Sequence, residues 1–311
     1  MKFSYNLPVD KMADPNEFLT AAAIGEIARA AEAAGFSACC VTDHPAPTQS
    51  WVDGGGHHAL DPFVGLAFAA AVTSRLRLHT NVIVGAYRNP FLMAKSAATL
   101  DRLSGGRLIF GIGSGYLKPE FDALGVPFEG RGDAIDEAIR LMKRIWTGET
   151  IDFEGKGFRA AGIASLPTPV QHPNPPLWSG GNSDRAIHRA VELCDGWSPF
   201  PVSGQGSVFT RTESLATLDD LARKIDFAKE YAVSVGRVQP LQICMVPFSL
   251  GRMPTTRPGR DVLIDEVSTL SALGVGWMTI SLPCHDRKEC IDNARWFGEE
   301  VIRAVSVKDL I

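Results

Sequence analysis

An acidic residue and an imidazole follow one another directly after a short apolar run. Asp43 and His44 come at the end of the run Ser37–Thr42, which has the composition of a buried strand. If this strand belongs to a parallel barrel, both side chains lie at its carboxyl end, where barrel enzymes carry their catalytic groups. Such a pair can transfer protons or hydrogen-bond a cofactor ring. The alternative is a loop-capping carboxylate beside a solvated imidazole.

A polar amide interrupts the next apolar run. Asn81 lies within Leu76–Val84, and a buried amide needs hydrogen-bond partners or a ligand. Its neighbours Val82 and Val84 could by themselves simply fill the interior of a barrel. The run therefore predicts a strand whose carboxyl half faces a ligand through Asn81.

A glycine-rich turn follows the fourth apolar run. The segment Gly111–Tyr116 lacks the spacing of a dinucleotide fingerprint, because Tyr116 stands in the place of the third glycine and Pro119 interrupts an immediate helix. Glycine instead lets the backbone approach a ligand closely at Gly115, with the hydroxyl of Ser114 beside it. A flexible turn from strand to loop is the alternative.

The clearest signal for an anion lies in the second half of the chain. The strand Leu177–Ser179 continues through Gly180 and Gly181 to Asn182 and Ser183, where a helix begins. Free backbone N–H groups and the helix dipole at such a turn favour a phosphate group. The alternative is a tight turn in which Ser183 only caps the helix.

Two neighbouring histidines belong to a glycine-rich loop. His57 and His58 follow Asp53–Gly56, and no third ligand has metal spacing, so no metal is predicted. We expect a lid over the substrate that includes Trp51–His58. The loop Pro45–Ala59 and the insertion Ile151–Pro169 are expected to shape specificity.

Alternation of strands and helices gives the fold that positions these residues. Eight short apolar runs are each followed by a stretch that can form a helix, which predicts a parallel sheet, and eight units in 311 residues favour a closed barrel. We therefore predict a single (β/α)₈ TIM-barrel domain spanning residues 1–311, with insertions in the loops at its C-terminal face and a hairpin at 154–157. The predicted strands are Lys2–Leu7, Ser37–Thr42, Leu76–Val84, Arg107–Ile112, Leu177–Ser179, Gly196–Pro199, Leu241–Phe248 and Gly276–Leu282.

Composition narrows the partners. A net charge of -4 without a basic run gives no electrostatic footprint for nucleic acid or an anionic membrane, so a small-molecule substrate is expected. No apolar segment approaches the roughly 18 residues of a membrane span, and the amino terminus lacks a signal peptide. The six cysteines have neither metal-ligand nor disulfide-framework spacing. Reduced thiols and a cytoplasmic location are therefore predicted.

Four segments together carry a resemblance to a known family. The chain resembles the luciferase-like flavin and deazaflavin oxidoreductase superfamily, and more closely its coenzyme F420-dependent branch. The resemblance covers residues 1 to about 200 well. Beyond residue 200 it rests on the regular spacing of the predicted strands. The matching segments are Ser104–Tyr116, Phe121–Arg131, Pro176–Asp184 and Cys194–Trp197.

The resemblance implies roles for the residues at the first strand ends. It places Asp43 beside the cofactor ring and makes His44 the proton donor or acceptor. It also implies a cis peptide between Asn81 and Val82 that bulges against the back face of the ring, with Val84 counted among the cofactor-binding residues.

The later motifs acquire roles in the same way. By resemblance, Ser114 and Gly115 approach the ribityl chain or the ring, and the segment Gly180–Ser183 holds the phosphate. Similar proteins form homodimers, so a homodimer is expected. In the sugar-phosphate dehydrogenases of this branch an acidic residue occupies the position of Tyr116, so that substrate class is not expected here.

The predicted activity is hydride transfer between coenzyme F420 and a small organic substrate that the sequence does not identify. An alternative is a monooxygenase that uses reduced FMN and oxygen on the same barrel. Both cofactors carry a phosphorylated ribityl chain, so the glycine turn cannot separate them. A second alternative is a barrel that binds a cofactor or has a structural role without catalysis.

Overall fold

Eight parallel strands form a closed barrel, as predicted. The computed structural model describes residues 1–155, 157–251 and 254–308. Neighbouring strands follow the order β1-β10-β9-β8-β7-β4-β3-β2, and β2 pairs back to β1. The barrel strands are β1 (Lys2–Asn6), β2 (Ala38–Val41), β3 (Arg77–Val84), β4 (Leu108–Gly113), β7 (Leu177–Gly180), β8 (Gly196–Ser198), β9 (Gln242–Met245) and β10 (Trp277–Ile280).

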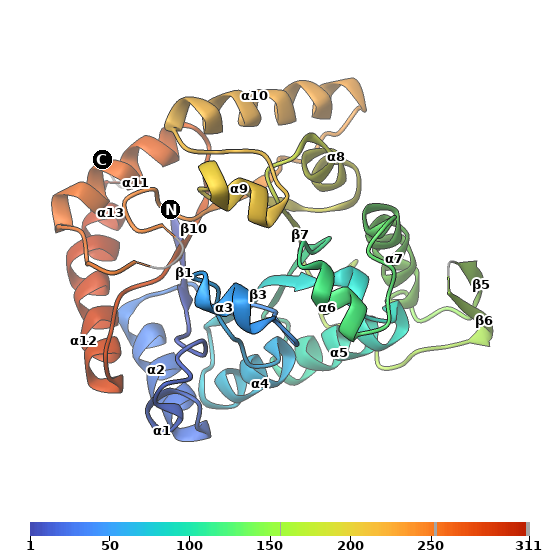
Figure 1. The fold of residues 1–311 in the computed structure, drawn as a ribbon, viewed down its shortest axis with the longest axis horizontal. Helices are drawn as coiled ribbons and strands as arrows, with labels where there is room; N and C mark the ends of the chain where they lie inside the picture. Colours follow the sequence, from blue (N-terminus) through green and yellow to red (C-terminus); the bar gives the residue numbers. More distant parts are fainter. Residues whose placement is uncertain (156, 252–253, 309–311) are drawn as a thin grey trace.

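Helices surround this barrel (Figure 1). The helices are α1 (Pro15–Phe18), α2 (Ala21–Ala34), α3 (Gln49–Asp53), α4 (Pro62–Val72), η1 (Gly85–Tyr87), α5 (Pro90–Leu103), α6 (Lys118–Ala123), α7 (Arg131–Ile145), α8 (Asp184–Leu193), α9 (Gly204–Thr210), α10 (Leu218–Ser234), α11 (Arg260–Ala272), α12 (Arg287–Phe297), η2 (Gly298–Ile302) and α13 (Arg303–Lys308). Among the described residues, no helix is long and apolar enough to cross a bilayer.

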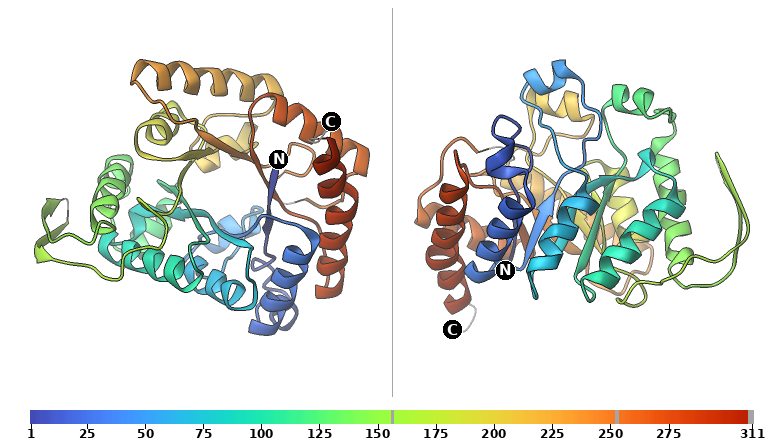
Figure 2. Two further views of the ribbon diagram at one scale, coloured as in Figure 1. Left: turned by 180° about the vertical axis from the view of Figure 1, so that it is seen from behind. Right: turned by 90° about the horizontal axis from the view of Figure 1, so that it is seen from below.

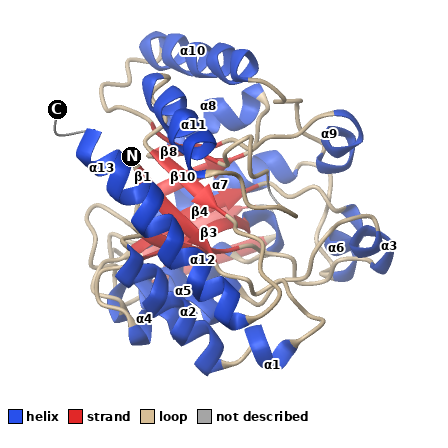
Figure 3. Ribbon diagram, turned by 90° about the vertical axis from the view of Figure 1, so that its left-hand side faces the viewer, coloured by secondary structure: helices blue, strands red, loops and turns tan. Residues whose placement is uncertain are grey.

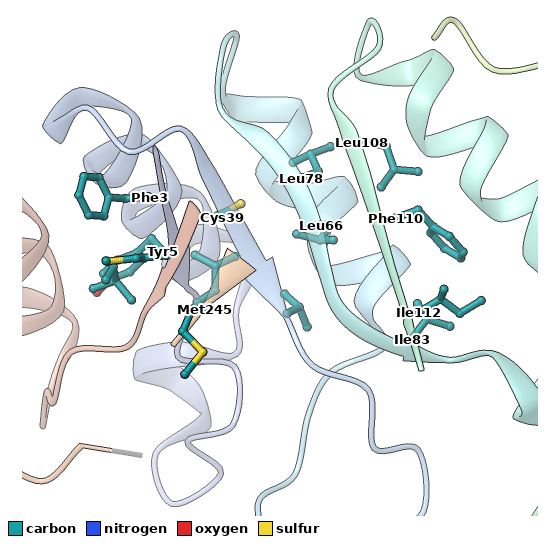
Figure 4. Packing of buried hydrophobic residues seen from close by; sticks show 14 of the residues in the cluster. Phe3, Tyr5, Cys39, Leu66, Leu78, Ile83, Leu108, Phe110, Ile112 and Met245 are labelled. Carbon is teal, nitrogen blue, oxygen red and sulfur yellow. The ribbon is translucent and has the colours of Figure 1, made fainter. Parts of the chain in front are cut away.

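The main core lies between the strands and the helices around them. Figure 4 shows side chains of neighbouring strands, such as Phe3, Leu78 and Phe110, in this layer, and each of the three is almost fully buried. Because alternate strand residues point to opposite faces, the intervening residues fill the barrel interior. His79 is one of these interior residues and is fully buried. The core therefore fixes the strand ends on which the site depends.

One predicted strand is too long. The sequence suggests a strand through Phe248, but β9 ends at Met245, and the chain turns at Pro247, whose carbonyl accepts the N–H of Gly251. Proline has no N–H to donate to a barrel neighbour, so the turn begins there.

The insertion after α7 folds as the predicted hairpin. Strands β5 (Ile151–Gly155) and β6 (Phe158–Ile163) pair antiparallel; Lys156, at the predicted turn, lies outside the described residues. The hairpin stands beside the barrel (Figure 2) and connects a helix to β7, so it belongs to the amino-terminal side. The described part of Ile151–Pro169 contributes nothing to the cavity below. The residues that the structure describes therefore show no contact through which this insertion would shape specificity, and that role stays a prediction.

The prediction that all six cysteines are free thiols is also wrong. Cys284 and Cys290 form a disulfide with Cα atoms 5.2 Å apart. The chain turns back after β10, which brings Cys284 against the first turns of α12, and a spacing of six residues did not reveal that turn. The other four cysteines are buried free thiols.

Candidate active site

A cavity of about 750 Å³ opens at the carboxyl ends of the barrel strands. In Figure 3, α3, α6 and α9 lie together beyond these strand ends. With the exception of Asn182, every residue assigned to the site from the sequence lines the cavity. These lining residues are Asp43, His44, Asn81, Val82, Val84, Ser114, Gly115, Gly180, Gly181 and Ser183.

Strand β3 carries a local bulge that points into the cavity. The peptide between Asn81 and Val82 is cis, as predicted, and the register with β4 shifts at this position. Neighbouring glycines leave space for the Val82 side chain: a Cβ at Gly113 would lie 2.9 Å from a methyl group of Val82, and one at Gly180 would lie 3.1 Å from both. The glycines of two strands therefore form a cradle around this valine.

The turn after β4 requires glycine. Gly115 has φ +76°, and a Cβ there would lie 2.5 Å from Val84. Both facts exclude other residue types without a rearrangement. The turn places Ser114 and Tyr116 along the cavity wall.

Asp43 connects the ends of two strands. Its buried carboxylate accepts the backbone N–H of Val84 at 2.8 Å and both terminal nitrogens of Arg88, one of them at 2.9 Å. Asp43 therefore combines the predicted position at the cavity with a structural task, since its oxygens hold the β2 and β3 ends together.

His44 has a buried carboxylate behind it. Its Nδ1 lies 3.3 Å from Oε2 of Glu120, a residue of α6 that is fully buried. Oε1 of Glu120 accepts the N–H of Ala46 at 3.1 Å, and Oε2 accepts the hydroxyl of Tyr87 at 2.6 Å. This network locks the carboxylate and, through it, the imidazole.

Burial and hydrogen bonds shift the pKa values of Glu120 and Tyr87 in opposite directions. Burial by itself would raise the pKa of Glu120, but hydrogen bonds from His44, Tyr87 and the Ala46 amide outweigh burial and lower it. Burial and the adjacent Glu120 raise the pKa of Tyr87, which therefore stays a donor. An ionised carboxylate only accepts hydrogen bonds, so Nδ1 of His44 donates to it, and in the neutral imidazole Nε2 then has the lone pair.

Sequence reasoning missed Glu120 and Tyr87. Pro119 does not interrupt a helix: it lies in the first turn of α6, where proline is tolerated. An acidic residue in a first turn usually faces the helix dipole at the surface, so nothing in the local pattern marked Glu120 as buried.

Aromatic rings form the wall beside His44. The ring centroid of Trp51 lies 4.5 Å from that of His44, and the centroid of His57 lies 4.9 Å away. Nε2 of His57 is 3.1 Å from the hydroxyl of Thr42. The predicted lid thus borders the cavity through Trp51 and His57. In the described part of the chain, no three His, Cys, Asp or Glu side chains gather as a metal site.

The glycine turn after β7 differs in detail from the predicted phosphate site. The N–H of Gly181 donates to the carbonyl of Ser198 at 3.3 Å, and that of Asn182 donates to Thr212 Oγ1 at 3.0 Å. The Ser183 hydroxyl accepts the N–H of Ala186 and caps α8. Protein acceptors thus already use part of the amide array on which the sequence argument relied.

Asn182 has a structural role. Its amide nitrogen donates to the carbonyls of Phe200 and Glu213 at 2.9 and 3.1 Å, and its oxygen accepts the N–H of Phe200 at 3.0 Å. The side chain is fully buried and fastens the loop after β8 across the turn. It lies among protein atoms because this loop, which the sequence did not position, folds over it.

Arginines supply the positive charge at this end of the cavity. The guanidinium carbons of Arg131 and Arg211 lie 3.9 and 4.7 Å from the ring centroid of Phe128, and Arg131 also donates to the carbonyl of Gly115. Burial, together with the positive charges of Arg211 and Arg185, lowers the pKa of Arg131. An anionic group would relieve this repulsion. Sequence reasoning included Arg131 in a matching segment without giving it a role.

One further carboxyl group lines the cavity. Asp10, in the loop after β1, has its pKa raised by burial. The apolar side chains of Leu7, Val9, Val246 and Phe209 line the cavity as well. The cavity therefore combines a positive end with walls that are largely apolar and aromatic.

Comparison with known proteins agrees with this geometry. Residues 1–228 match the model of the family described as luciferase-like monooxygenase. An uncharacterised protein of Mycobacterium tuberculosis is 31% identical over 260 residues, which cover 79% of this chain and 81% of that protein. A second uncharacterised protein of the same species is 34% identical over 186 residues, or 56% of this chain and 66% of that protein.

Solved structures of two cofactor types share the fold. A monooxygenase from Streptomyces bottropensis has a TM-score of 0.77 at 20% identity, with 98% of this chain and 100% of the other covered. The coenzyme F420-dependent tetrahydromethanopterin reductase of Methanopyrus kandleri has a TM-score of 0.71 at 18% sequence identity, and the match covers 97% of this chain and 99% of that protein. A Baeyer–Villiger monooxygenase from Pseudomonas putida, solved in complex with FMN, has a TM-score of 0.73 at 15% sequence identity, and the match covers 97% of this chain and 98% of that protein. Through its matched residues, the chain belongs to the luciferase-like monooxygenase family.

Proposed function

We propose that this protein is an oxidoreductase that transfers hydride between a deazaflavin of the F420 type and a small organic substrate. One observation carries the proposal: a single cavity joins the Val82 bulge, the glycine cradle around it, a cluster of arginines and the His44–Glu120 pair. Flavin-type cofactors need a flat apolar support for the ring and positive charge for the phosphate. The cavity offers both.

The residues present fit such a cofactor. The positions of Gly113 and Gly180 stay open only because they lack a Cβ, which allows a planar ring to approach Val82. Arg131 and Arg211 would hold the phosphate, with Ser183 at the edge of the same cavity. This assignment transfers the predicted phosphate contact from the backbone amides to the guanidinium groups.

The protein's own groups supply orientation and a proton. When bound, the deazaflavin supplies the ring carbon that accepts or donates hydride. Val82 supports the ring, and Trp51 and His57 help to keep water from the reacting face. Glu120 keeps the His44 imidazole in one orientation, so that Nε2 can take up or release the proton that accompanies each hydride.

An FMN-dependent monooxygenase is the second candidate. It is supported by two structural neighbours, the monooxygenase from Streptomyces bottropensis and the Baeyer–Villiger monooxygenase from Pseudomonas putida, the second of which was solved in complex with FMN. We place the deazaflavin first because the four matching segments resemble the F420-dependent branch more closely. The same resemblance supports a homodimer, and sedimentation velocity would test the dimer directly.

Titration of the purified chain with oxidised F420 and, separately, with FMN tests the proposal through fluorescence quenching. We expect F420 to bind at least about tenfold more tightly than FMN, which corresponds to about 1.4 kcal/mol. Arg131→Met should weaken F420 binding by about tenfold, because it removes a charged hydrogen-bond donor. Arg140→Met, an exposed residue of α7 outside the cavity, is the matched control. Tight FMN binding without F420 binding would contradict the proposal.

A different variant distinguishes the proposed enzyme from a barrel without catalytic activity. His44→Ala should lower turnover of an identified substrate by about 10² to 10⁴, the usual range for a general acid or base. Cofactor affinity should change little, since Val82 and the arginines remain. Unchanged turnover would remove the role assigned to His44.

A further inference from the structure

Tyr116 lines the cavity beside His44. Its hydroxyl is 3.4 Å from Nε2 of His44, and the residue lines the cavity directly after the tight turn at Gly115. The tyrosine and imidazole rings meet edge to face with centroids 5.9 Å apart. The activity proposed above gives this tyrosine no role.

Hydrogen-bond chemistry orders the groups into a chain. Glu120 accepts from Tyr87 on one side and from Nδ1 of His44 on the other. With the proton on Nδ1 of the neutral ring, Nε2 can only accept, and the hydroxyl of Tyr116 lies 3.4 Å away as a donor. The order Tyr87, Glu120, His44, Tyr116 therefore runs from the core to the cavity.

We propose that Tyr116 is a catalytic residue that exchanges a proton with the oxygen of the substrate, while His44 behind it stores that proton. The inference rests on the proposed hydride transfer and names the chemistry of its substrate. A phenol hydroxyl can donate to a carbonyl oxygen or accept from an alcohol. The substrate class is therefore a small molecule with a hydroxyl or carbonyl group at the reacting carbon.

The proton and electron balance follows from this arrangement. In the oxidising direction, the O–H bond of the substrate breaks and its proton passes to the oxygen of Tyr116. The phenol proton passes at the same time to Nε2 of His44, which becomes a cation beside Glu120. A bound deazaflavin would supply the acceptor for the hydride that leaves the reacting carbon, so that the alcohol would be oxidised by two electrons to a carbonyl. Reduction of a carbonyl runs through the same steps in reverse.

The surroundings of His44 favour this route over direct contact with substrate. His44 is only 8% exposed, and Trp51 covers one side of its ring. His57 faces the ring edge, but its Nε2 is placed beside the hydroxyl of Thr42.

The charges around His44 are accounted for as well. Asp43, the neighbour in sequence, is neutralised by Arg88, which leaves Glu120 as the carboxylate in contact with the imidazole. The remaining titratable groups that face the ring are the hydroxyls of Tyr87 and Tyr116 and the imidazole of His57.

Nitrogen NMR of the histidine rings in the full chain without cofactor tests the inference. We expect His44 to carry its proton on Nδ1. Tyr116→Phe should shift the Nε2 resonance and move the titration midpoint of His44 upward by about 0.5 to 1 pH, because the lost hydrogen bond stabilised the neutral ring. Glu120→Gln should move the midpoint downward by about 1 to 3 pH, because the carboxylate stabilises the cation.

Tyr231→Phe, on the outer helix α10, is the matched control and should change neither quantity. If Tyr116→Phe leaves both the Nε2 resonance and the midpoint unchanged, Tyr116 is not joined to His44 and the inference is wrong. Because this measurement needs no cofactor, it separates that failure from a failure of the proposed function, which appears as absent F420 binding in the titration above.

Discussion

Two buried carboxylates in this site have different tasks because their partners differ. Asp43 is paired with Arg88, a guanidinium that stays charged at every working pH, so this pair is permanent and structural. Glu120 is paired with His44, an imidazole that exists in a neutral and a charged form. A carboxylate beside a fixed charge holds strand ends together, whereas one beside an imidazole can support proton transfer.

The structural role of Asp43 can be measured as stability. Asp43→Asn leaves the partly buried Arg88 with only Asp61 as its counter-charge and replaces one of the two carboxylate acceptors with an NH₂ donor. We expect the free energy of unfolding to fall by about 2 to 3 kcal/mol, below the cost of a fully buried pair because Arg88 is partly exposed. Urea denaturation gives this value.

A surface pair provides the comparison. Asp122→Asn breaks an ion pair with Lys118 in which both side chains are more than half exposed, so a change below about 0.5 kcal/mol is expected. Equal effects of the two substitutions would show that Asp43 contributes no more than a surface charge.

At the scale of elements, the bulge of β3 and the glycines of its neighbours depend on each other. Val82 projects into the cavity only because positions 113 and 180 have no side chains. Gly113→Ala should therefore displace Val82 and weaken cofactor binding by about tenfold, since overpacking typically costs 1 to 3 kcal/mol. Fluorescence titration with F420 measures the effect.

A second substitution should restore part of the lost cofactor affinity in the same titration. The double variant Gly113→Ala with Val82→Ala should recover part of the lost affinity, because the clashing methyl groups are gone. Gly259→Ala, where an added Cβ meets nothing within 4 Å, is the control. No recovery in the double variant would mean that Gly113 acts otherwise than by leaving space for Val82.

The connection between β10 and α12 makes a direct chemical prediction. Thiol counting in denaturant without reductant should give four reactive thiols, from Cys39, Cys40, Cys194 and Cys244, and six after reduction. Six thiols without reductant would show that Cys284 and Cys290 are unpaired in the isolated protein.

Elements were easier to predict from sequence than contacts. The alternation of strands and helices predicted a strand at the position of β8, although β8 comprises only Gly196–Ser198. The predicted range differs from the observed one by one residue. The bond between His44 and Glu120 joins residues 76 positions apart, and no local pattern encodes it. The predicted phosphate turn was found in the right place, but the loop that occupies its amides could not be folded from sequence.

For the whole molecule, the barrel interior makes stability depend on pH. Burial, with a smaller contribution from Arg77, lowers the pKa of His79 from 6.5 to about 3. Below pH 6.5 the unfolded chain binds a proton at this residue that the folded barrel does not bind until about pH 3. The free energy of unfolding therefore falls as the pH falls through this window.

This dependence belongs to one side chain and can be removed. Between pH 7 and pH 5, His79 should account for a loss of about 2 kcal/mol in the free energy of unfolding. His79→Asn, which keeps an acceptor near Ser4, should make that part of the loss disappear in urea denaturation at the two pH values. An unchanged difference between the two pH values would show that His79 is protonated in the folded barrel.

Loops from both halves of the barrel line the cavity, and we predict that one ligand spans them. A crystal structure of the chain with oxidised F420 tests this most directly. We predict the deazaflavin ring against Val82 with its reacting face toward Tyr116 and His44, and the phosphate between Arg131 and Arg211. A ring bound away from Val82, or a phosphate remote from these arginines, would contradict the account.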